Sequence, residues 1–274
     1  MNGLAHEAHG TSTAAVVLPL LATAIVAGGY VALAARQREQ APRWRTALFL
    51  TGCAVLAVAA VPGLSPYPEA DFRGHMLQHL LIGMVAPTCL ALGAPMTLVL
   101  RNIPVRRRRL AAVILRGRAV HVLTHPVTVL ALTVGGLVAL YATPLAGLVD
   151  ARPAAHHLVH LHFLVSGYLF AWLVAGPDPA PHRPGVPARL VLLGIAVTAH
   201  STLSQLMYAG VLGGADVPAV QLRGAAVLMY YGGDIAELAL AVALVGAWRP
   251  ARPGRRGPLA SAVSPATSVG EGTR

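Results

Sequence analysis

The sequence predicts an all-α fold, a polytopic membrane protein built as a bundle of seven transmembrane helices. Of its 274 residues, 55% are hydrophobic and only 11% are charged, and the mean hydropathy is +0.63. A soluble domain of this size needs more charge to cover its surface. A membrane-spanning helix needs about 20 mostly apolar residues. Seven segments meet this requirement, roughly Ala14–Ala35, Thr46–Pro62, His75–Leu100, Val122–Thr143, His156–Ala175, Ala188–Gly210 and Leu222–Trp248.

Proline and glycine mark where these helices bend or end. The first two segments are continuous apolar runs, whereas the third carries Pro87 and Pro95. We therefore expect a kink or an early end there, with a bend at Gly93–Pro95. The fifth segment stops at Gly176-Pro-Asp-Pro179, which favours a structural role for that motif. Cys53 and Cys89 lie far apart inside apolar runs and are expected to act as small hydrophobic residues.

The arginines predict the orientation. All 21 basic residues are arginine, and all but Arg73, Arg152 and Arg223 lie in alternate loops or in the C-terminal tail. Because cytoplasmic loops carry the excess of basic residues, we expect the N-terminus outside and the C-terminus in the cytoplasm of a bacterial cell, after an odd number of crossings. The net charge of +11 then reflects topology and contact with the lipid bilayer. We expect no nucleic-acid partner.

The chain is expected to form one domain. Residues 1–250 make up the seven-helix membrane domain, and residues 251–274, rich in proline, glycine and serine, are predicted to be a disordered cytoplasmic tail. The first thirteen residues carry no arginine, so we expect a short translocated N-terminus and no signal peptide. The oligomeric state stays open.

Histidines form two clusters at the predicted outer face. His75 and His79 are four residues apart, which places both imidazoles on one helix face, and His156 and His160 repeat the spacing. Two facing pairs would suit copper or zinc, and nearby thioethers would favour Cu(I). We predict these four residues as metal ligands. The second choices are Met76, His157, His162, His200 and Met207. Interfacial polarity and proton or haem chemistry are the alternatives.

Acidic residues in the last helix form a second constellation. Tyr230, Asp234 and Glu237 lie on one helix face, and His200 on the sixth segment is placed at a similar depth. Carboxyl groups near the middle of a membrane are costly unless they are paired, protonated or hydrated. Either Asp234 and His200 form an inert interhelical hydrogen bond, or Asp234 and Glu237 act in function, as buried polar partners that orient a ligand histidine or compensate charge.

Several blocks resemble one known family. The segment from His75 to Pro87, HMLQHLLIGMVAP, is followed by the Leu92-Gly-Ala-Pro95 block, and both resemble the signature of the CtaG-type cytochrome c oxidase assembly proteins of caa-type oxidases. Further similar blocks follow in the same order: His156-His157 with His160 and Phe163, Gly176-Pro-Asp-Pro179, and Gln221 to Asp234. The resemblance implies a polytopic protein that matures cytochrome c oxidase and assists copper insertion on the outer side.

These observations lead to one expected function and two alternatives. We expect a non-enzymatic assembly factor in the bacterial plasma membrane, with oxidase subunits as partners and copper as the bound metal. A copper transporter would instead use His200, Asp234 and Glu237 as the middle of a path across the membrane. A haem-binding membrane oxidoreductase would use paired histidines as axial ligands.

Overall fold

A computed structural model describes residues 13–37, 42–61, 66–68, 71–143, 145, 153–181, 183–213 and 217–248. Every regular element in these ranges is helical, so the predicted all-α class is confirmed. The elements are α1 (Thr13–Ala35), α2 (Arg43–Ala60), α3 (Phe72–Leu80), the π-helix η2 (Leu81–Val85), α4 (Ala86–Leu92), α5 (Pro95–Asn102), α6 (Val105–Leu115), α7 (Arg118–Leu123), α8 (Pro126–Ala142), α10 (Pro153–Val174), α11 (Val186–Tyr208) and α12 (Ala219–Gly246). The predicted disordered tail, residues 251–274, and the N-terminal twelve residues lie outside the described ranges.

Six helices of the described ranges are long and apolar enough to cross a membrane: Val16–Ala35, Arg43–Ala60, Phe72–Leu92, Ala155–Val174, Val186–Tyr208 and Ala219–Gly246. The predicted fourth span is α8, which is apolar but only 17 residues long. Outward-facing side chains are also apolar, and on α12 Ile235, Leu238 and Val242 are 65–70% exposed. An apolar exterior around a packed interior is typical of helices surrounded by lipid. The chain is a multi-pass membrane protein.

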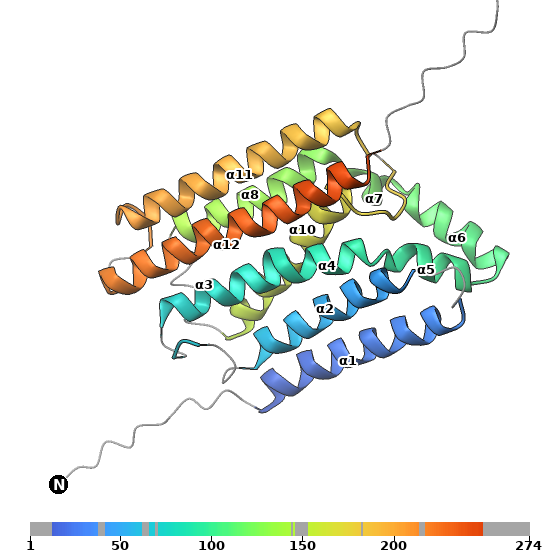
Figure 1. Cartoon of the computed structure of the whole chain (residues 1–274), viewed down its shortest axis with the longest axis horizontal. Coiled ribbons are helices and arrows are strands. Elements are labelled where there is room, and N and C mark those ends of the chain that lie inside the picture. The colour runs from blue at the N-terminus through green and yellow to red at the C-terminus, as the bar shows by residue number, and fades with distance from the viewer. Residues whose placement is uncertain are drawn as a thin grey trace, which may run out of the picture.

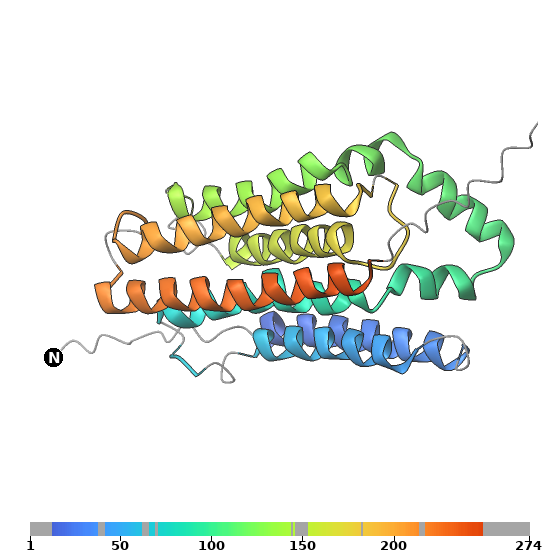
Figure 2. The same ribbon diagram turned by 45° about the horizontal axis from the view of Figure 1, so that its top comes forward.

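The column formed by α3, η2 and α4 lies at the centre of the bundle. It packs against α2 on one side and against α10 and α12 on the other, while α1 covers α2 and α8 packs on α10 and α11 (Figure 1). Figure 2 shows the same arrangement from another side, with α1 and α2 together below and α8 with α11 above. The central column therefore contacts three of the other long helices, α2, α10 and α12.

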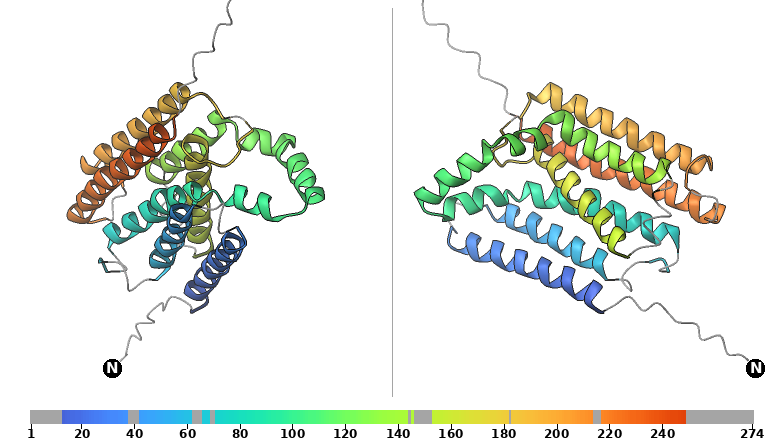
Figure 3. Two further views of the ribbon diagram at one scale, coloured as in Figure 1. Left: turned by 45° about the vertical axis from the view of Figure 1, so that its right-hand side comes forward. Right: turned by 180° about the vertical axis from the view of Figure 1, so that it is seen from behind.

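The two ends of the bundle differ in charge. The segment with seven arginines between residues 101 and 118 projects from one end as α5, α6 and α7 (Figure 3). We had expected a loop here, and this was wrong, because arginine, leucine and alanine are all good helix formers. The first turns of α3, α10 and α12 lie at the opposite end (Figure 1). The histidine clusters and the arginine-rich helices are thus separated by the length of the bundle.

The predicted third span is interrupted twice. The π-helix η2 ends at Val85, just before Pro87, and α4 ends at Leu92, so the expected kink or early end of this segment is confirmed. The expected bend at Gly93–Pro95 is confirmed, because Ala94 adopts a left-handed conformation with φ 55°. A proline removes one helical hydrogen bond and its ring displaces the carbonyl four residues earlier. A wider turn before Pro87 accommodates this displacement.

Asp178 joins the end of α10 to the start of α5. Its side chain is fully buried and accepts hydrogen bonds from the backbone N–H of Met96 at 2.9 Å and of Thr97 at 2.7 Å. The Thr97 hydroxyl donates a third bond. Arg183 donates to the Asp178 and Trp172 carbonyl oxygens at 2.7 and 2.9 Å. The Gly176–Pro179 motif therefore does more than stop a helix, because its aspartate caps another helix about 80 residues earlier in the chain.

Replacing Asp178 by alanine is expected to lower the stability of the bundle by about 2–4 kcal/mol, because three buried donors lose their acceptor at once. Asp178→Asn should lose less, since the amide oxygen still accepts. The measurement is thermal unfolding of the purified protein in detergent. An Asp178→Ala variant that unfolds at the wild-type temperature would contradict this account of the cap.

Candidate metal-binding site

The four predicted ligand histidines meet at one end of the bundle. Along α3 the ring centroids of His75 and His79 are 4.3 Å apart, and along α10 those of His156 and His160 are 4.1 Å apart. Between the helices, His75 lies 5.6 Å from His156 and His79 lies 5.2 Å from His160. The four rings form a closed quadrilateral, which we call the histidine quartet. Because the contacts follow the same order in both helices, α3 and α10 run in the same direction.

Gly167 of α10 lets these helices approach closely. A Cβ atom on Gly167 would collide with the carbonyl oxygen of Gly83 and press against Pro87. The backbones of α10 and η2 therefore touch about two helical turns from the quartet. Helices that touch through small residues pack at short range. This contact brings the preceding turns of α3 and α10 near enough for their imidazoles to meet.

The quartet contains buried nitrogen atoms without partners. His79 is only 6% exposed, and neither of its ring nitrogens has a hydrogen-bond partner. The buried Nε2 of His160 also lacks one. Such a buried polar atom costs about 1–3 kcal/mol when it stays unsatisfied. His79 packs edge-on against Phe163 at 4.9 Å, so its ring is held in place without a polar partner.

The nitrogens do not yet converge on a common point. In the described part of the chain, no group of three or more His, Cys, Asp or Glu side chains is already arranged so that it could hold a metal ion. The rings are tilted against one another by 42° to 72°. Coordination of an ion would require the imidazoles to turn about their side-chain bonds.

The second-choice residues separate into two groups. Met76 is buried beside the quartet, and its sulfur accepts a hydrogen bond from the Tyr141 hydroxyl at 3.7 Å. His157 is exposed, His162 turns away so that its Nε2 lies 3.2 Å from the Leu132 carbonyl oxygen, and Met207 is fully buried in an apolar cluster. Met76 is therefore the buried second choice next to the four rings, while the exposed His157 lies at the edge of the quartet, with its ring centroid 6.2 Å from that of His156.

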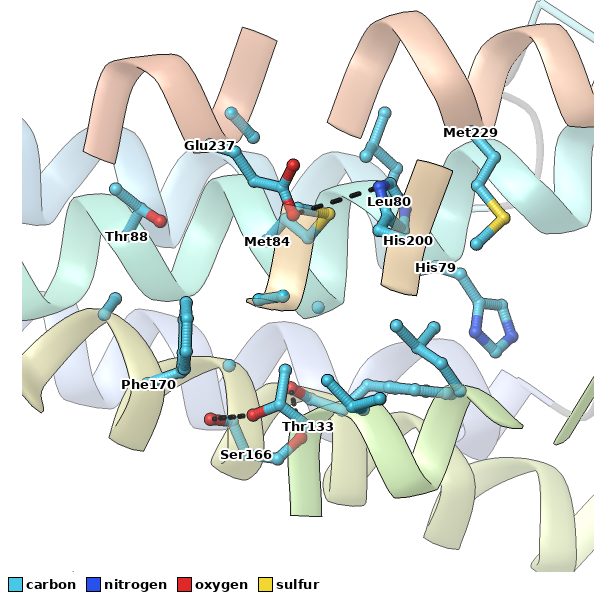
Figure 4. A pocket seen from close by; sticks show the side chains of 18 of the residues that line it. His79, Leu80, Met84, Thr88, Thr133, Ser166, Phe170, His200, Met229 and Glu237 are labelled. Carbon is cyan, nitrogen blue, oxygen red and sulfur yellow. Dashed lines mark hydrogen bonds and ion pairs between the residues drawn. The ribbon is translucent and has the colours of Figure 1, made fainter. Parts of the chain in front are cut away.

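His200 lies deeper, on the wall of an internal cavity. Its Nδ1 is 4.0 Å from Oε1 of Glu237, and both side chains are buried. Figure 4 shows this ion pair within the cavity, which His79 also lines. Asp234 and Tyr230 are half-buried and do not line the cavity. The buried carboxyl group nearest to His200 is thus that of Glu237, whereas the sequence analysis had paired His200 with Asp234.

A set of hydrogen bonds that fixes the start of α3 beside the quartet was not found from the sequence. Asp71 caps α3 by accepting from the Arg73 backbone N–H at 2.9 Å, and the Arg73 guanidinium pairs with the same carboxylate. This hydrogen-bonded cation lowers the pKa of Asp71 below its usual value. Gln221 of α12 accepts from the Phe72 backbone N–H at 3.2 Å. An aspartate directly before a helix indicates an N-cap and could have been recognised in the sequence. The Gln221 contact could not, because it joins residues 149 positions apart.

The fold and the quartet define a class: a multi-pass helical membrane protein in which four imidazoles from two parallel helices meet at one end of the bundle. The chain belongs to the cytochrome c oxidase caa3 assembly factor (Caa3_CtaG) family, whose model matches residues 27–251. The family expected from the histidine and proline blocks is therefore confirmed.

Curated relatives come from mycobacteria. The chain is 35% identical over 187 residues to an uncharacterized protein of Mycobacterium tuberculosis, a match that covers 65% of this chain and 28% of the relative. An uncharacterized protein of Mycobacterium leprae is 35% identical over 191 residues, covering 66% of this chain and 29% of the relative. The chain thus spans less than a third of the length of these relatives. No solved structure matches it.

Gly167→Ala is expected to destabilise the bundle by about 1–3 kcal/mol, because the added methyl group collides with backbone rather than with a flexible side chain. The matched control is Gly194→Ala on α11, where a Cβ atom meets nothing within 4 Å. That control should unfold at or above the wild-type temperature, since alanine favours a helix over glycine. Thermal unfolding in detergent compares the two variants, and equal midpoints would refute the close contact.

Proposed function

We propose that the chain is a cytochrome c oxidase assembly factor that holds copper, as cargo for the oxidase, on the histidine quartet. The observation that carries the proposal is the meeting of His75, His79, His156 and His160 from two separate helices. Family membership supports the oxidase as client. The chain's role is to bind and release an ion, so no catalytic residue is assigned.

Ring spacing supports a shared ion. Metal–nitrogen bonds of about 2.0 Å in a tetrahedral site place the centroids of two imidazole ligands about 5 Å apart. The four neighbouring centroid distances in the quartet are 4.1, 4.3, 5.2 and 5.6 Å. These distances lie near that value, which supports the proposal, and binding would require the rings to turn because their nitrogens do not share a point. The unpartnered nitrogens of His79 and His160 would then gain the bonds they lack.

Copper fits this donor set. Imidazole suits copper and zinc, and a thioether favours Cu(I) over zinc. The Met76 sulfur lies on the same wall as His79, with Tyr141 as its neighbour. The resemblance of the His75–Pro87 block already implied copper insertion. Copper as the bound ion and the oxidase as the recipient are therefore consistent with one process, the maturation of the oxidase.

We assign the quartet to the extracytoplasmic side of a bacterial plasma membrane. The arginine-rich helices α5 to α7 would face the cytoplasm, where basic residues concentrate. With α8 counted as the fourth of seven spans, the N-terminus is outside and the C-terminus is inside. A 17-residue helix spans a membrane when the bilayer thins locally or when its flanking residues reach the interface. Copper would then be delivered to the oxidase from the outer side.

The two alternatives have less support. A haem would have to insert between imidazoles that already contact one another, and the internal cavity of about 70 Å³ is far below the roughly 300–1,000 Å³ of organic-ligand sites. A transport path would have to continue from the cavity to the arginine-rich end. That part of the bundle is filled by an apolar cluster that includes Val129, Leu173, Val174, Leu193 and Leu244.

Complementation of a deletion strain at limiting copper tests the proposal. The wild-type gene should restore oxidase activity and copper content, and His79→Asn should restore neither, because one of four ligands is lost from the most buried position. His157→Asn is the matched control, since His157 is exposed beside the quartet and should complement fully. Immunoblots verify equal membrane levels.

Haem content of the membranes separates copper delivery from a general loss of the oxidase, and it should stay at the wild-type level in the His79→Asn strain. Normal oxidase activity in the deletion strain at low copper would overturn the proposed function. Full complementation by His79→Asn would overturn the role of the quartet.

A further inference from the structure

A partly open cavity continues from the quartet into the middle of the bundle. It is lined from α3, η2, α4, α8, α10, α11 and α12, and its volume is about 70 Å³. A single water needs roughly 10–15 Å³ measured in this way, so the space suits an ion or a few waters. His79 and Met76 line one part of it. The cavity and the quartet therefore share the His79 imidazole.

Methionine and histidine side chains, whose sulfur and nitrogen atoms can bind soft metal ions, line the cavity. The chain has six methionines, and three of them, Met76, Met84 and Met229, line this space together with His79 and His200. In the view of Figure 4, Glu237, His200 and His79 follow one another along the cavity, and the Met84 and Met229 thioethers occupy the same stretch. Thioether with imidazole is a donor set that selects Cu(I) among biological metals.

The interruption in the central column keeps these side chains on one wall. In a regular α-helix of 3.6 residues per turn, a residue twelve positions along points about 120° away from the first. Yet Met76 and Thr88, twelve positions apart, both line the cavity, as do Leu80 and Met84 between them. The wider turn of η2 slows the rotation of the helix and so aims Met84 into the cavity.

Polar atoms in the cavity lack partners. His200 is 4% exposed and Glu237 is 6% exposed. Neither Nδ1 of His200 nor Oε2 of Glu237 has a hydrogen-bond partner, and the 4.0 Å from His200 Nδ1 to the other carboxyl oxygen, Oε1, is too long for a hydrogen bond. The His200 ring packs directly on Gly233, where any Cβ would collide with it. The bundle thus holds an unsatisfied imidazole and an unsatisfied carboxyl oxygen against a thioether-lined space.

We infer that this cavity is a second, internal site for Cu(I), with the Met84 and Met229 thioethers and the His200 imidazole as ligands. Glu237 is the only acidic residue among those that line the cavity. One carboxylate neutralises one monovalent cation, and an uncompensated charge is strongly disfavoured in a low-dielectric interior. Cu(II) or Zn²⁺ would keep a net positive charge there.

The inference rests on the proposed function for the route by which the ion arrives, because His79 belongs to both sites. Exchange between them moves Cu(I) from imidazole to thioether and imidazole ligands without a change of oxidation state. The apolar cluster beyond the cavity closes the far side. The internal site therefore stores an ion that returns through the quartet.

Cu(I) loading of the full-length protein in detergent, under anaerobic conditions, tests the second site. Native mass spectrometry should count two ions per chain. The Met84→Leu, Met229→Leu double variant should bind one, with the second ion at least tenfold weaker, because leucine keeps the volume but removes both sulfurs. Met96→Leu is the matched control, since Met96 packs in the apolar cluster outside the cavity, and it should still bind two.

A variant of the quartet distinguishes a failure of the internal site from a failure of the proposed function. His75→Ala with His156→Ala removes ligands that do not line the cavity, so this variant should lose the outer ion and keep the internal one. Binding of one ion to the wild type, or a second ion that is insensitive to the loss of both sulfurs, would overturn the internal site. Loss of the outer ion from the quartet variant supports the proposed function, whether or not the internal site binds an ion. Gel filtration confirms that every variant is folded.

Discussion

The contact between the backbones of Gly83 and Gly167 is the constraint on which the rest of the site depends. Because Gly167 has no Cβ atom, α10 touches the Gly83 carbonyl of η2, where any larger residue at position 167 would separate the two helices. Two parallel helices that each begin with paired histidines then place all four imidazoles within 4.1–5.6 Å of a neighbour. Ligand chemistry at the end of the bundle thus follows from helix packing near its centre.

The membrane makes this arrangement informative. Unsatisfied polar atoms are costly where no water can reach them. In the described residues, five such side-chain atoms belong to one connected region, on His79, His160, His200 and Glu237. The outer end of that region is the quartet and its inner part is the thioether-lined cavity. The others are single atoms on Gln37, Arg45, Trp172, Arg183 and Arg189. Only in the connected region do several of them lie where one bound ion would satisfy them.

Much of this was predictable from the sequence. Apolar segment lengths gave the all-α membrane class, and the four-residue histidine spacing identified both pairs, because each depends on residues that are neighbours within one helix. The facing of the two pairs depends on the contact of Gly167 with the Gly83 carbonyl in a different span, and no local pattern reveals that contact. The pairing of His200 with Glu237 rather than Asp234 depends on how far α12 is rotated. Asp178 was seen only as part of a helix stop, since the residues it caps lie about 80 positions away.

The most direct test of the central claim is X-ray absorption spectroscopy of the purified protein loaded with one equivalent of Cu(I). The account predicts three or four imidazole nitrogens at about 2.0 Å from the copper, with the outer-shell scattering that imidazole rings produce. That signal should collapse in the His79→Asn variant and persist in His157→Asn. A spectrum without imidazole scattering, or one unchanged by His79→Asn, would contradict the claim that the quartet is the site of copper binding.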